Sequence, residues 1–536
     1  MNNMVKNRTD DFNVGKEIKH FLQDRTPSGL NTERIKIFYI TCLALCFFLT
    51  GSTFFTIFIK SSSSNNIIYQ KDSCYRPTIF DRNGVILAQS ILAFDFAIQP
   101  NKVENINTIS KKLKSILPSV DLSKLDANKK FVYIKRNVDI EVYTKIKSAI
   151  GHFKGVQLIP VKKRIYPIKS VEHIIGTADD CSGKTKLEYK LNPFFEKEKN
   201  DAFLTIDSRI QRSLNNQLES AIRKFKAKGA FAIIMDVKTN EIIALVSNYE
   251  NSHYRIEPID GRFELGSVLK VFNTACALAT DSVTVDEVFD IPKSYKIGKF
   301  TVKDAGRHKH DELSVKDIFK FSSNVGSIKI AEKMGIQNQK KCFEKLGIIG
   351  KQNFVSSIKL VRSGEPKEWS KNKSLSISYG YGLSINPITM LVAFNATING
   401  GLLIQPSLLK NRSVDKSERI LLPHISSQIL QILHDATGQG GTASRVKVLD
   451  ISIGAKTGTA NKFKDGKYNS KSVYTSILVV LPIQQPQYSM LIVLDEPQTV
   501  KGVVPSRLSY YNVVPTAHNI LEEIIPLLDI YKMMEE

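Results

Sequence analysis

The first apolar pattern in the chain is a nearly uninterrupted hydrophobic run at residues 37–59. About twenty such residues are enough for a helix that crosses a bilayer. The run is longer than the apolar part of a typical signal peptide, and the small residues at 51–53 make a poor cleavage site. We therefore predict a retained transmembrane anchor, with a cleavable signal peptide as the alternative.

Polar residues of mixed charge precede this run, and lysines and arginines are frequent close to it. Basic flanks stay on the cytoplasmic side of a membrane, so the N-terminus is expected inside the cell. The pattern predicts a cytoplasmic tail at 1–36, an anchor at 37–59 and everything after Lys60 outside.

Residues 60–220 mix short strand-like runs with amphipathic helical stretches and offer no cluster of catalytic side chains. A serine-rich linker at 61–66 opens the region, and the pattern at 75–88 predicts two strands joined by an Asn-Gly turn. Further predicted elements are helices at 109–117, 142–150 and 210–222 and a strand at 156–160. We expect a spacer or docking domain.

From 221 to 536 the apolar pattern predicts a second domain, of the α+β class. The strand-like stretches lie at 230–236, 242–247, 456–460, 473–481 and 488–495. Helical patterns lie at 270–279, 315–321, 328–334 and 388–396, and a last helix at 516–531 is interrupted at Pro526. These elements fit one antiparallel sheet of about five strands with helices on its faces.

The hydrophobic content and the net charge of the chain limit the classes of protein to which it can belong. The 536 residues are 42% hydrophobic, which suits folded domains. The formal net charge of +23 raises the question of an anionic partner such as nucleic acid or acidic phospholipid. The excess is scattered lysine rather than a dense basic block with interleaved aromatic residues, so we expect no nucleic-acid binding.

The chain has 6 cysteines, and because they lack zinc-finger spacing we expect no metal site. Cys42 and Cys46 lie in the predicted anchor and are expected to be packing residues. We expect Cys276 to be a buried free thiol, because it lies in a long apolar run. If the protein is exported, Cys74, Cys181, Cys276 and Cys342 could pair in three ways, and Cys74 with Cys181 is the one pairing that merits a test.

The main chemical signal lies at 263–272, where Ser267 precedes Lys270 by three positions. Residues at this spacing share a helix face, so the lysine can reach the serine hydroxyl. Serine needs a base to take its proton, and a lysine can serve only if its surroundings hold it neutral. The apolar run at 271–278 could supply such surroundings.

The Ser-x-x-Lys spacing alone is a weak signal, because the chain repeats it at Ser356/Lys359, Ser370/Lys373, Ser413/Lys416 and Ser444/Lys447. Two later elements strengthen the first pair, namely Ser322-Ser323-Asn324 and then Lys456-Thr457-Gly458-Thr459. This is the order expected of penicillin-recognising serine enzymes. The ordered trio predicts an acyl-enzyme mechanism with Ser267 as the nucleophile.

With these motifs the chain resembles the class B penicillin-binding proteins, the membrane-anchored peptidoglycan D,D-transpeptidases. The resemblance covers nearly everything after residue 74 and includes the stretches at 76–88, 164–167, 173–176, 204–207 and 378–383. Residues 322–326, 464–468 and 495–498 are similar to the division-type (septal, FtsI) branch. The resemblance implies a single transmembrane helix, an elongated pedestal (dimerisation-type) domain at 60–220 and a transpeptidase domain at 221–536.

The resemblance also implies roles for the motif residues. Ser267 would attack the carbonyl of a D-Ala-D-Ala stem peptide, and an amine from a second stem would resolve the acyl-enzyme. Lys270 would take the serine proton, and Ser322 would relay protons between Lys270, Lys456 and the leaving amine. Lys456 would favour neutral Lys270 and attract the substrate carboxylate. Asn324 would hydrogen-bond the substrate amide.

Thr457 and Thr459 alternate with Gly458 along a strand edge, so both hydroxyls are expected to face the cleft, and the absent side chain would let the peptide approach closely. The resemblance implies an oxyanion hole made by the backbone N–H groups of Ser267 and Thr459. Some positions depart from the proline or glycine usual in the family, without removing a reacting group. They are Pro77, Asn240, Leu265 and Ala455.

The resemblance places the protein in the bacterial inner membrane with its catalytic domain in the periplasm, and it implies no cofactor. Expected partners are peptidoglycan stem peptides, β-lactams, a membrane glycan polymerase and other division proteins. A single activity is expected, since residues 60–220 lack an acidic motif for a glycosyltransferase. The alternatives are an elongation-type transpeptidase, a serine β-lactamase, and a non-catalytic division scaffold or β-lactam receptor.

Overall fold

The computed structural model describes residues 76–530, apart from 124, 127, 251, 306–309, 351–358, 411–416, 449–450, 465, 503 and 529. The predicted tail and anchor, the serine-rich linker and Cys74 lie outside the described residues. Within the described ranges, no helix is both long and apolar enough to cross a membrane.

The N-terminal part is built on a 5-stranded sheet with the order β3-β2-β1-β5, in which β4 also pairs with β2. Its strands are β1 (Ile79–Phe80), β2 (Ile86–Ile98), β3 (Val132–Val138), β4 (Val156–Ile165) and β5 (Ala202–Phe203). The hairpin predicted at 75–88 is confirmed, because β1 and β2 pair antiparallel. Asp81 Oδ1 closes its turn by accepting hydrogen bonds from the N–H groups of Asn83 and Val85, each at 2.8 Å.

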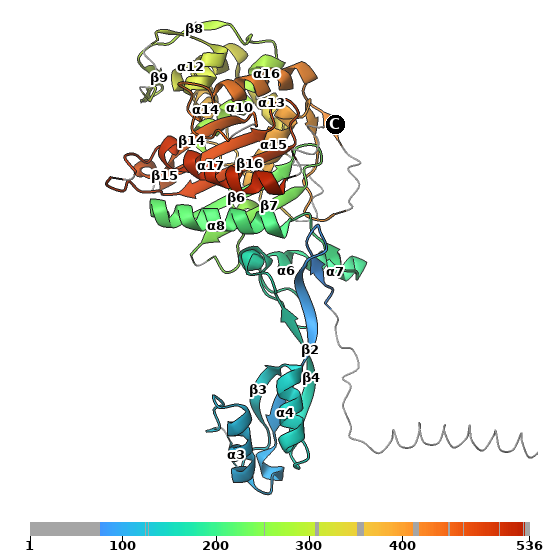
Figure 1. Cartoon of the computed structure of the whole chain (residues 1–536). Helices are drawn as coiled ribbons and strands as arrows, with labels where there is room; N and C mark the ends of the chain where they lie inside the picture. The colour runs from blue at the N-terminus through green and yellow to red at the C-terminus, as the bar shows by residue number, and fades with distance from the viewer. Residues whose placement is uncertain are drawn as a thin grey trace, which may run out of the picture. The chain divides into compact units, whose positions relative to one another are not determined.

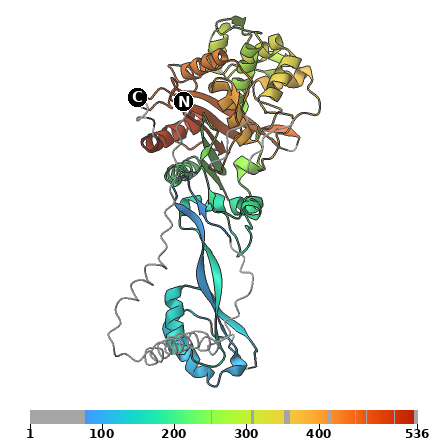
Figure 2. The same cartoon turned by 90° about the vertical axis from the view of Figure 1, so that its right-hand side faces the viewer.

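The predicted strand at 156–160 is longer than expected, because β4 continues to Ile165. The apolar pattern stops at residue 160, but β4 stays paired with β2 along its whole length to Ile165. Figure 2 shows these two strands coiled around each other as a ribbon. The predicted helices at 109–117 and 142–150 are confirmed as α3 (Ile106–Ile116) and α4 (Ile140–Ile150), each beginning earlier at an Asn or Asp cap.

A buried ion cluster lies where the N-terminal strands meet the short helix α6 (Lys186–Lys190). The carboxylate of Glu188 is 2.5 Å from Arg76 Nε and 2.8 Å from Arg164 Nε. The three side chains are only 0%, 1% and 3% exposed respectively. Arg76 also donates to the carbonyl of Glu188 and to Asn192 Oδ1. We call this the Arg–Glu–Arg cluster.

The C-terminal part contains a 5-stranded sheet with the order β14-β15-β16-β6-β7, in which all neighbours are antiparallel. Its strands are β6 (Gly229–Asp236), β7 (Ile242–Tyr249), β14 (Gly454–Lys464), β15 (Lys467–Leu481) and β16 (Tyr488–Asp495). The sheet predicted from the apolar pattern is therefore confirmed. The strands β14 and β15 extend beyond the apolar stretches because they form a hairpin that continues past the core.

Helices cover both faces of this sheet, and the alternation along β6 assigns the faces. Ala230, Ala232 and Ile234 pack with α8 (Ser208–Phe225) and α17 (Val513–Ile524). Figure 1 shows these two helices along one face of the sheet, with the remaining helices of the domain on the other. The predicted last helix starts earlier, at Val513, and gives way to a short 3₁₀ turn that contains Pro526.

The second face carries the helices that hold the motifs. Phe231, Ile233 and Met235 point into this larger core. Its helices are α10 (Lys270–Ala279), α11 (Val315–Phe321), α12 (Asn324–Met334), α13 (Ile336–Lys345), α14 (Lys371–Ser378), α15 (Pro387–Ile398) and α16 (Pro423–Asp435). The helices predicted in this domain are confirmed, and α12 begins at Asn324 rather than at 328.

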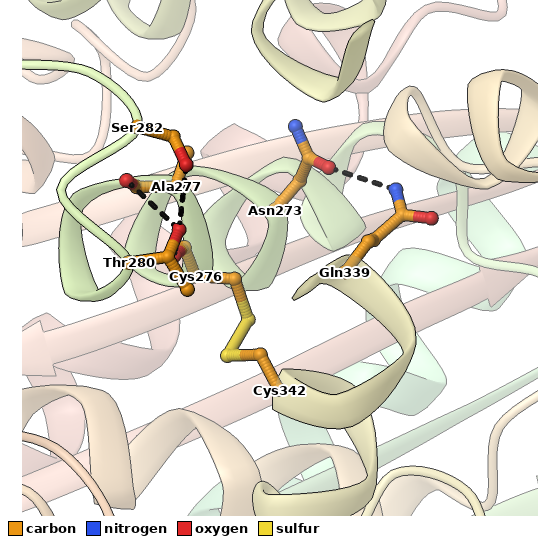
Figure 3. Close-up of a disulfide and its surroundings, with 7 residues drawn as sticks. All are labelled: Asn273, Cys276, Ala277, Thr280, Ser282, Gln339 and Cys342. Atoms are coloured by element: carbon orange, nitrogen blue, oxygen red, sulfur yellow. Dashed lines mark hydrogen bonds between the residues drawn. A yellow bond between two sulfur atoms is a disulfide. The ribbon is translucent and has the colours of Figure 1, made fainter. Parts of the chain in front are cut away.

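The expectation that Cys276 is a free thiol is wrong. Cys276 on α10 forms a disulfide with Cys342 on α13, with the two Cα atoms 5.8 Å apart (Figure 3). One turn earlier, Gln339 Nε2 donates a hydrogen bond to Asn273 Oδ1 across the same pair of helices. The apolar run does bury Cys276, but burial alone did not reveal that α13 brings a second cysteine alongside it. Cys181 is exposed, and its predicted pairing with Cys74 stays a prediction.

Candidate active site

The candidate nucleophile lies in a short 3₁₀ turn, η4 (Gly266–Leu269), that leads directly into α10. Gly266 has a φ of +66°, and a Cβ atom there would lie 2.7 Å from the carbonyl oxygen of Thr459. Only glycine allows this turn to approach β14 so closely. Ser267 follows, half-buried, and Lys270 is the first residue of α10 with 1% of its surface exposed.

The Lys270 amine is held by the turn between α11 and α12. Its Nζ donates to the Ser322 carbonyl at 2.7 Å, to Asn324 Oδ1 at 2.8 Å and to Ser322 Oγ at 3.3 Å. Ser267 Oγ makes no hydrogen bond to Lys270 in the described part of the chain. Catalytic hydrogen bonds are often long in free enzymes and shorten when substrate binds, so the spacing of one helical turn is compatible with a base.

Burial dominates the electrostatics of Lys270. It lowers the pKa of the Lys270 amine from 10.5 to about 7, and the negative charge of Asp304 opposes the shift. Around pH 7 a large fraction of Lys270 is therefore neutral, which is the state that a general base requires.

Ser322 Oγ lies between two lysine amines. Lys456 on β14 is fully buried, and its Nζ donates to Ser322 Oγ at 2.9 Å and to the Thr457 carbonyl at 3.1 Å. The amine also lies 5.4 Å from the centre of the Phe319 ring. Ser322 has a φ of +59° at the end of α11, and this unusual backbone turns its hydroxyl and its carbonyl towards Lys270. We call Lys270, Ser322 and Lys456 the Lys–Ser–Lys cluster.

The start of α12 is fixed by a residue that the sequence patterns did not single out. The Asp304 carboxylate accepts hydrogen bonds from Ser323 Oγ at 2.6 Å, from the Asn324 N–H at 2.5 Å and from the Val325 N–H at 3.0 Å. Ser323 is the N-cap of α12 and accepts from the Gly326 N–H at 2.9 Å. Asp304 lies in no motif, so only the folded loop reveals its contact with Ser323 and Asn324.

The threonines of the β14 motif are engaged by neighbours. Thr457 Oγ1 donates to Thr442 Oγ1 at 2.9 Å, whereas Thr459 Oγ1 lies 2.7 Å from Ser509 Oγ. Ser509 also donates from its hydroxyl to the carbonyl of Gly458. Thr442 and Ser509 thus belong to the site although sequence patterns gave no signal for either.

Gly458 has a structural reason for being glycine, and its expected role in substrate approach stays a prediction. A Cβ atom at this position would lie 2.2 Å from the Leu265 carbonyl oxygen and 2.5 Å from Ser476 Oγ. The missing side chain makes room for the protein's own backbone just before Ser267. Gly458 and Gly266 together allow β14 and η4 to lie in contact.

The other Ser-x-x-Lys pairs lie elsewhere. Ser370 is the N-cap of α14 and accepts from the Lys373 N–H at 3.4 Å. Ser444 lies in the loop before β14, where the Lys447 carbonyl contacts His518. Ser356 and the pair Ser413/Lys416 lie outside the described residues. Of the described pairs, the one at Ser267 is joined to the Ser322 and Lys456 motifs by the contacts above.

Matches to family models cover most of the chain. Residues 230–522 match the penicillin binding protein transpeptidase domain, and residues 71–201 match the penicillin-binding protein dimerisation domain. The first match spans all three motifs. In the described part of the chain, no group of His, Cys, Asp or Glu side chains is arranged to hold a metal ion.

Curated relatives are similar over most of their length. The chain is 29% identical to "Probable peptidoglycan D,D-transpeptidase FtsI" of Caulobacter vibrioides, covering 86% of this chain and 82% of the relative. It is 26% identical to "Peptidoglycan D,D-transpeptidase FtsI" of Buchnera aphidicola, covering 87% and 92%. It is also 26% identical to "Probable peptidoglycan D,D-transpeptidase PenA" of Neisseria meningitidis, covering 82% and 83%.

A solved structure shares the fold of the C-terminal part. It is the transpeptidase domain of Burkholderia pseudomallei penicillin-binding protein 3, with a TM-score of 0.54 and 24% identity. The match covers 61% of this chain and 96% of that domain. At this identity the likeness concerns the fold, and it supports the sheet and helix layers described above.

Proposed function

The chain belongs to the penicillin-binding protein transpeptidase family, as a class B member of the FtsI-like type, and from this premise we propose that it crosslinks peptidoglycan stem peptides during septal cell-wall synthesis. The observation that carries the proposal is the Lys–Ser–Lys cluster, one helical turn from Ser267. In it Ser322 Oγ contacts both Lys270 and Lys456, and both amines are buried.

Acylation starts at Ser267. Its Oγ attacks the carbonyl of the penultimate D-Ala, and its proton passes to the neutral Lys270 amine. The proton then reaches the nitrogen of the departing D-Ala through Ser322, which is within hydrogen-bond distance of both lysines. The C–N bond breaks, terminal D-Ala leaves, and the donor stem remains as an ester on Ser267.

Transfer reverses these proton movements. The amine of a second stem attacks the ester carbonyl and gives a proton to Lys270, and Ser267 Oγ is released with its proton restored. One amide bond is broken and one is formed, so the crosslink needs no ATP outside the membrane. Asn324 is proposed to hydrogen-bond the stem amide, in line with its position beside the Lys270 amine.

The oxyanion hole is proposed to consist of the backbone N–H groups of Ser267 and Thr459. The close approach of Gly266 to the Thr459 carbonyl supports this, because it brings the two segments together. Loss of one such donor typically costs roughly 3 kcal/mol of transition-state stabilisation. Ser509, by fixing the Gly458 carbonyl and the Thr459 hydroxyl, is proposed to set the orientation of this strand edge.

The proposed setting is the outer face of the bacterial inner membrane. The apolar run at 37–59 would be a single retained anchor, with residues 1–36 in the cytoplasm and the catalytic domain in the periplasm. Proposed partners are a membrane glycan polymerase that supplies nascent strands, other division proteins, and β-lactams as covalent inhibitors. A mature N-terminus mapped between residues 50 and 70 would rule out the retained anchor.

Fluorescent penicillin tests the chemistry of the full chain. We expect stable labelling that peptide mapping assigns to Ser267, and no labelling of folded Ser267→Ala protein. The matched control is Ser444→Ala, which removes a hydroxyl from another Ser-x-x-Lys pair and should label normally. Rapid loss of the adduct would instead indicate a β-lactamase, and absence of an adduct in the wild type would indicate a non-catalytic scaffold.

Depletion in the native host tests the septal role. Cells that lose the protein should fail to septate, and Ser267→Ala should reach midcell without restoring division. Loss of elongation with normal septa would assign the chain to the elongation branch and leave the transpeptidase chemistry in place.

A further inference from the structure

Asp304 is an acidic residue that accepts hydrogen bonds from the Ser322-Ser323-Asn324 motif and from the residue after it. It lies just after β10 (Phe300–Val302), half-buried, and is 19 positions before Ser323 in the chain. Its two oxygens have separate roles. Oδ1 accepts from the N–H groups of Asn324 and Val325, whereas Oδ2 accepts from Ser323 Oγ.

These bonds determine where α12 begins. Ser323 Oγ donates to Asp304 and accepts from the Gly326 N–H, so it connects the loop to the first turn of α12. Asn324 is held through both its N–H, by Asp304, and its side-chain amide, which donates to the Lys303 carbonyl at 3.0 Å. Its Oδ1 is thereby left directed at Lys270 Nζ. Ser322, on the other side of Ser323, supplies the other acceptors of that amine.

We propose that Asp304 is a positioning residue of the acyl-transfer reaction, which holds Ser322 and Asn324 against the Lys270 amine and contributes a negative charge to the site. The proposal rests on the function proposed above and adds a residue to its machinery. The evidence for this proposal is the set of hydrogen bonds that Asp304 accepts from Ser323, Asn324 and Val325.

The charge of Asp304 adds a second effect. Asp304 favours the protonated form of Lys270, against the larger effect of burial, and so keeps its pKa from falling further. Among the residues that the structure describes, the other charged group near this amine is Lys456 of β14, which contacts it through Ser322. The α11–α12 turn supplies the neutral Ser322 and Asn324, and α13 meets α10 through a disulfide and the neutral Gln339. Removal of the Asp304 charge should therefore shift the titration of Lys270 to lower pH.

Two variants of Asp304 separate its effect on the positions of Ser322 and Asn324 from the effect of its negative charge. Asp304→Asn retains an oxygen for the Asn324 and Val325 N–H groups but is neutral. Asp304→Ala removes both the acceptor and the charge. The matched controls are Asp207→Asn and Asp207→Ala, because Asp207 is the cap of α8, which packs on the C-terminal sheet, and accepts from the Arg209 N–H at 2.9 Å.

The measurement is the second-order rate of fluorescent-penicillin acylation of the full chain in detergent, from pH 5 to 9, with thermal melting of each variant. Asp304→Ala should acylate roughly 10-fold to 100-fold more slowly at every pH, as expected for misplaced catalytic groups. Asp304→Asn should retain most of the maximal rate, with the rise of its profile moved to lower pH because the charge that favours protonated Lys270 is gone. The Asp207 variants should melt earlier and keep the wild-type profile.

The outcomes distinguish this inference from the function on which it rests. If the wild-type chain is not labelled at Ser267, the proposed function fails. If the wild type is labelled and the Asp304 variants match the Asp207 variants in rate and pH profile, Asp304 is only a structural cap and the inference is overturned.

Discussion

Two buried clusters in this protein have the same arrangement and opposite chemistry. In the Arg–Glu–Arg cluster a carboxylate lies between two cations, with the Glu188 oxygens 2.5 Å and 2.8 Å from the two arginines. In the Lys–Ser–Lys cluster a neutral hydroxyl lies between two lysine amines, with Ser322 Oγ 3.3 Å from Lys270 Nζ and 2.9 Å from Lys456 Nζ. The central group differs in charge, and the flanking groups differ in kind, arginines in the first cluster and lysines in the second.

The difference shows how burial can serve structure in one place and reactivity in another. Buried cations need a compensating anion or must lose their charge. Arginine does not release its proton in proteins, so Glu188 supplies the anion. Lysine can release its proton, and burial lowers the pKa of Lys270 to about 7. In the second cluster, no carboxylate among the described residues lies between the lysines to compensate the charge of Lys270. Lys270 therefore loses its proton near neutral pH and can act as a base.

Exchanging the central group of the Lys–Ser–Lys cluster should produce the largest effect. In Ser322→Asp a carboxylate would stabilise protonated Lys270, raise its pKa and remove the relay hydroxyl. The left-handed backbone at Ser322 tolerates aspartate and asparagine, so the fold should survive. At pH 7 we expect acylation by fluorescent penicillin to fall by roughly 100-fold to 10,000-fold.

The matched variant Ser322→Asn loses the relay but adds no charge. Its rate should lie above that of Ser322→Asp at pH 7, and its profile should not move to higher pH. Equal profiles for the two variants would show that charge compensation does not control Lys270.

The reverse exchange tests the Arg–Glu–Arg cluster. Glu188→Gln leaves two buried guanidinium groups beside a neutral amide, and neither can escape by deprotonation. We expect the free energy of unfolding in urea to fall by about 3 kcal/mol, while the protein that remains folded still labels at Ser267. Glu141→Gln is the control, because its pair with Lys145 is exposed and its loss should leave stability nearly unchanged. Loss of labelling in folded Glu188→Gln would mean that the two clusters are not separate in function.

A smaller effect is expected when one flanking cation is removed. Arg164→Met retains the contact between Glu188 and Arg76 and fills the space with an apolar side chain. Arg164 Nη2 is buried and has no hydrogen-bond partner among the described residues, so its removal also relieves an unsatisfied group. We expect a loss of about 2 kcal/mol in the same urea titration, less than for Glu188→Gln. A loss larger than that of Glu188→Gln would contradict the central role of the carboxylate.

Local patterns were sufficient to predict much of this molecule. Apolar alternation predicted the strands of the C-terminal sheet, and the order of Ser267, Ser322 and Lys456 predicted a site that the fold does assemble. These signals are local because the reacting groups lie in short motifs and because core strands alternate between two packed faces.

The missed features depend on segments that meet only after folding. Cys276 and Cys342 are separated by 66 positions, and Asp304 reaches Ser323 from a loop outside any motif. Thr442 and Ser509 contact the β14 threonines from segments on either side of it in sequence. No periodicity or spacing encodes such contacts, because they follow from helix and loop packing. The same holds for Gly458, whose neighbour Leu265 is distant in sequence.

The pH dependence of acylation at Ser267 tests the central claim most directly, because the claim is that burial makes Lys270 a base near neutrality. A base is active when deprotonated, so a pKa lowered to about 7 predicts a rate that is low in acid and rises as the pH passes through about 7. The second-order rate with fluorescent penicillin should reach half of its plateau there. A rate that stays flat down to pH 5, or a rise delayed until the range of an exposed lysine near 10.4, would contradict the account.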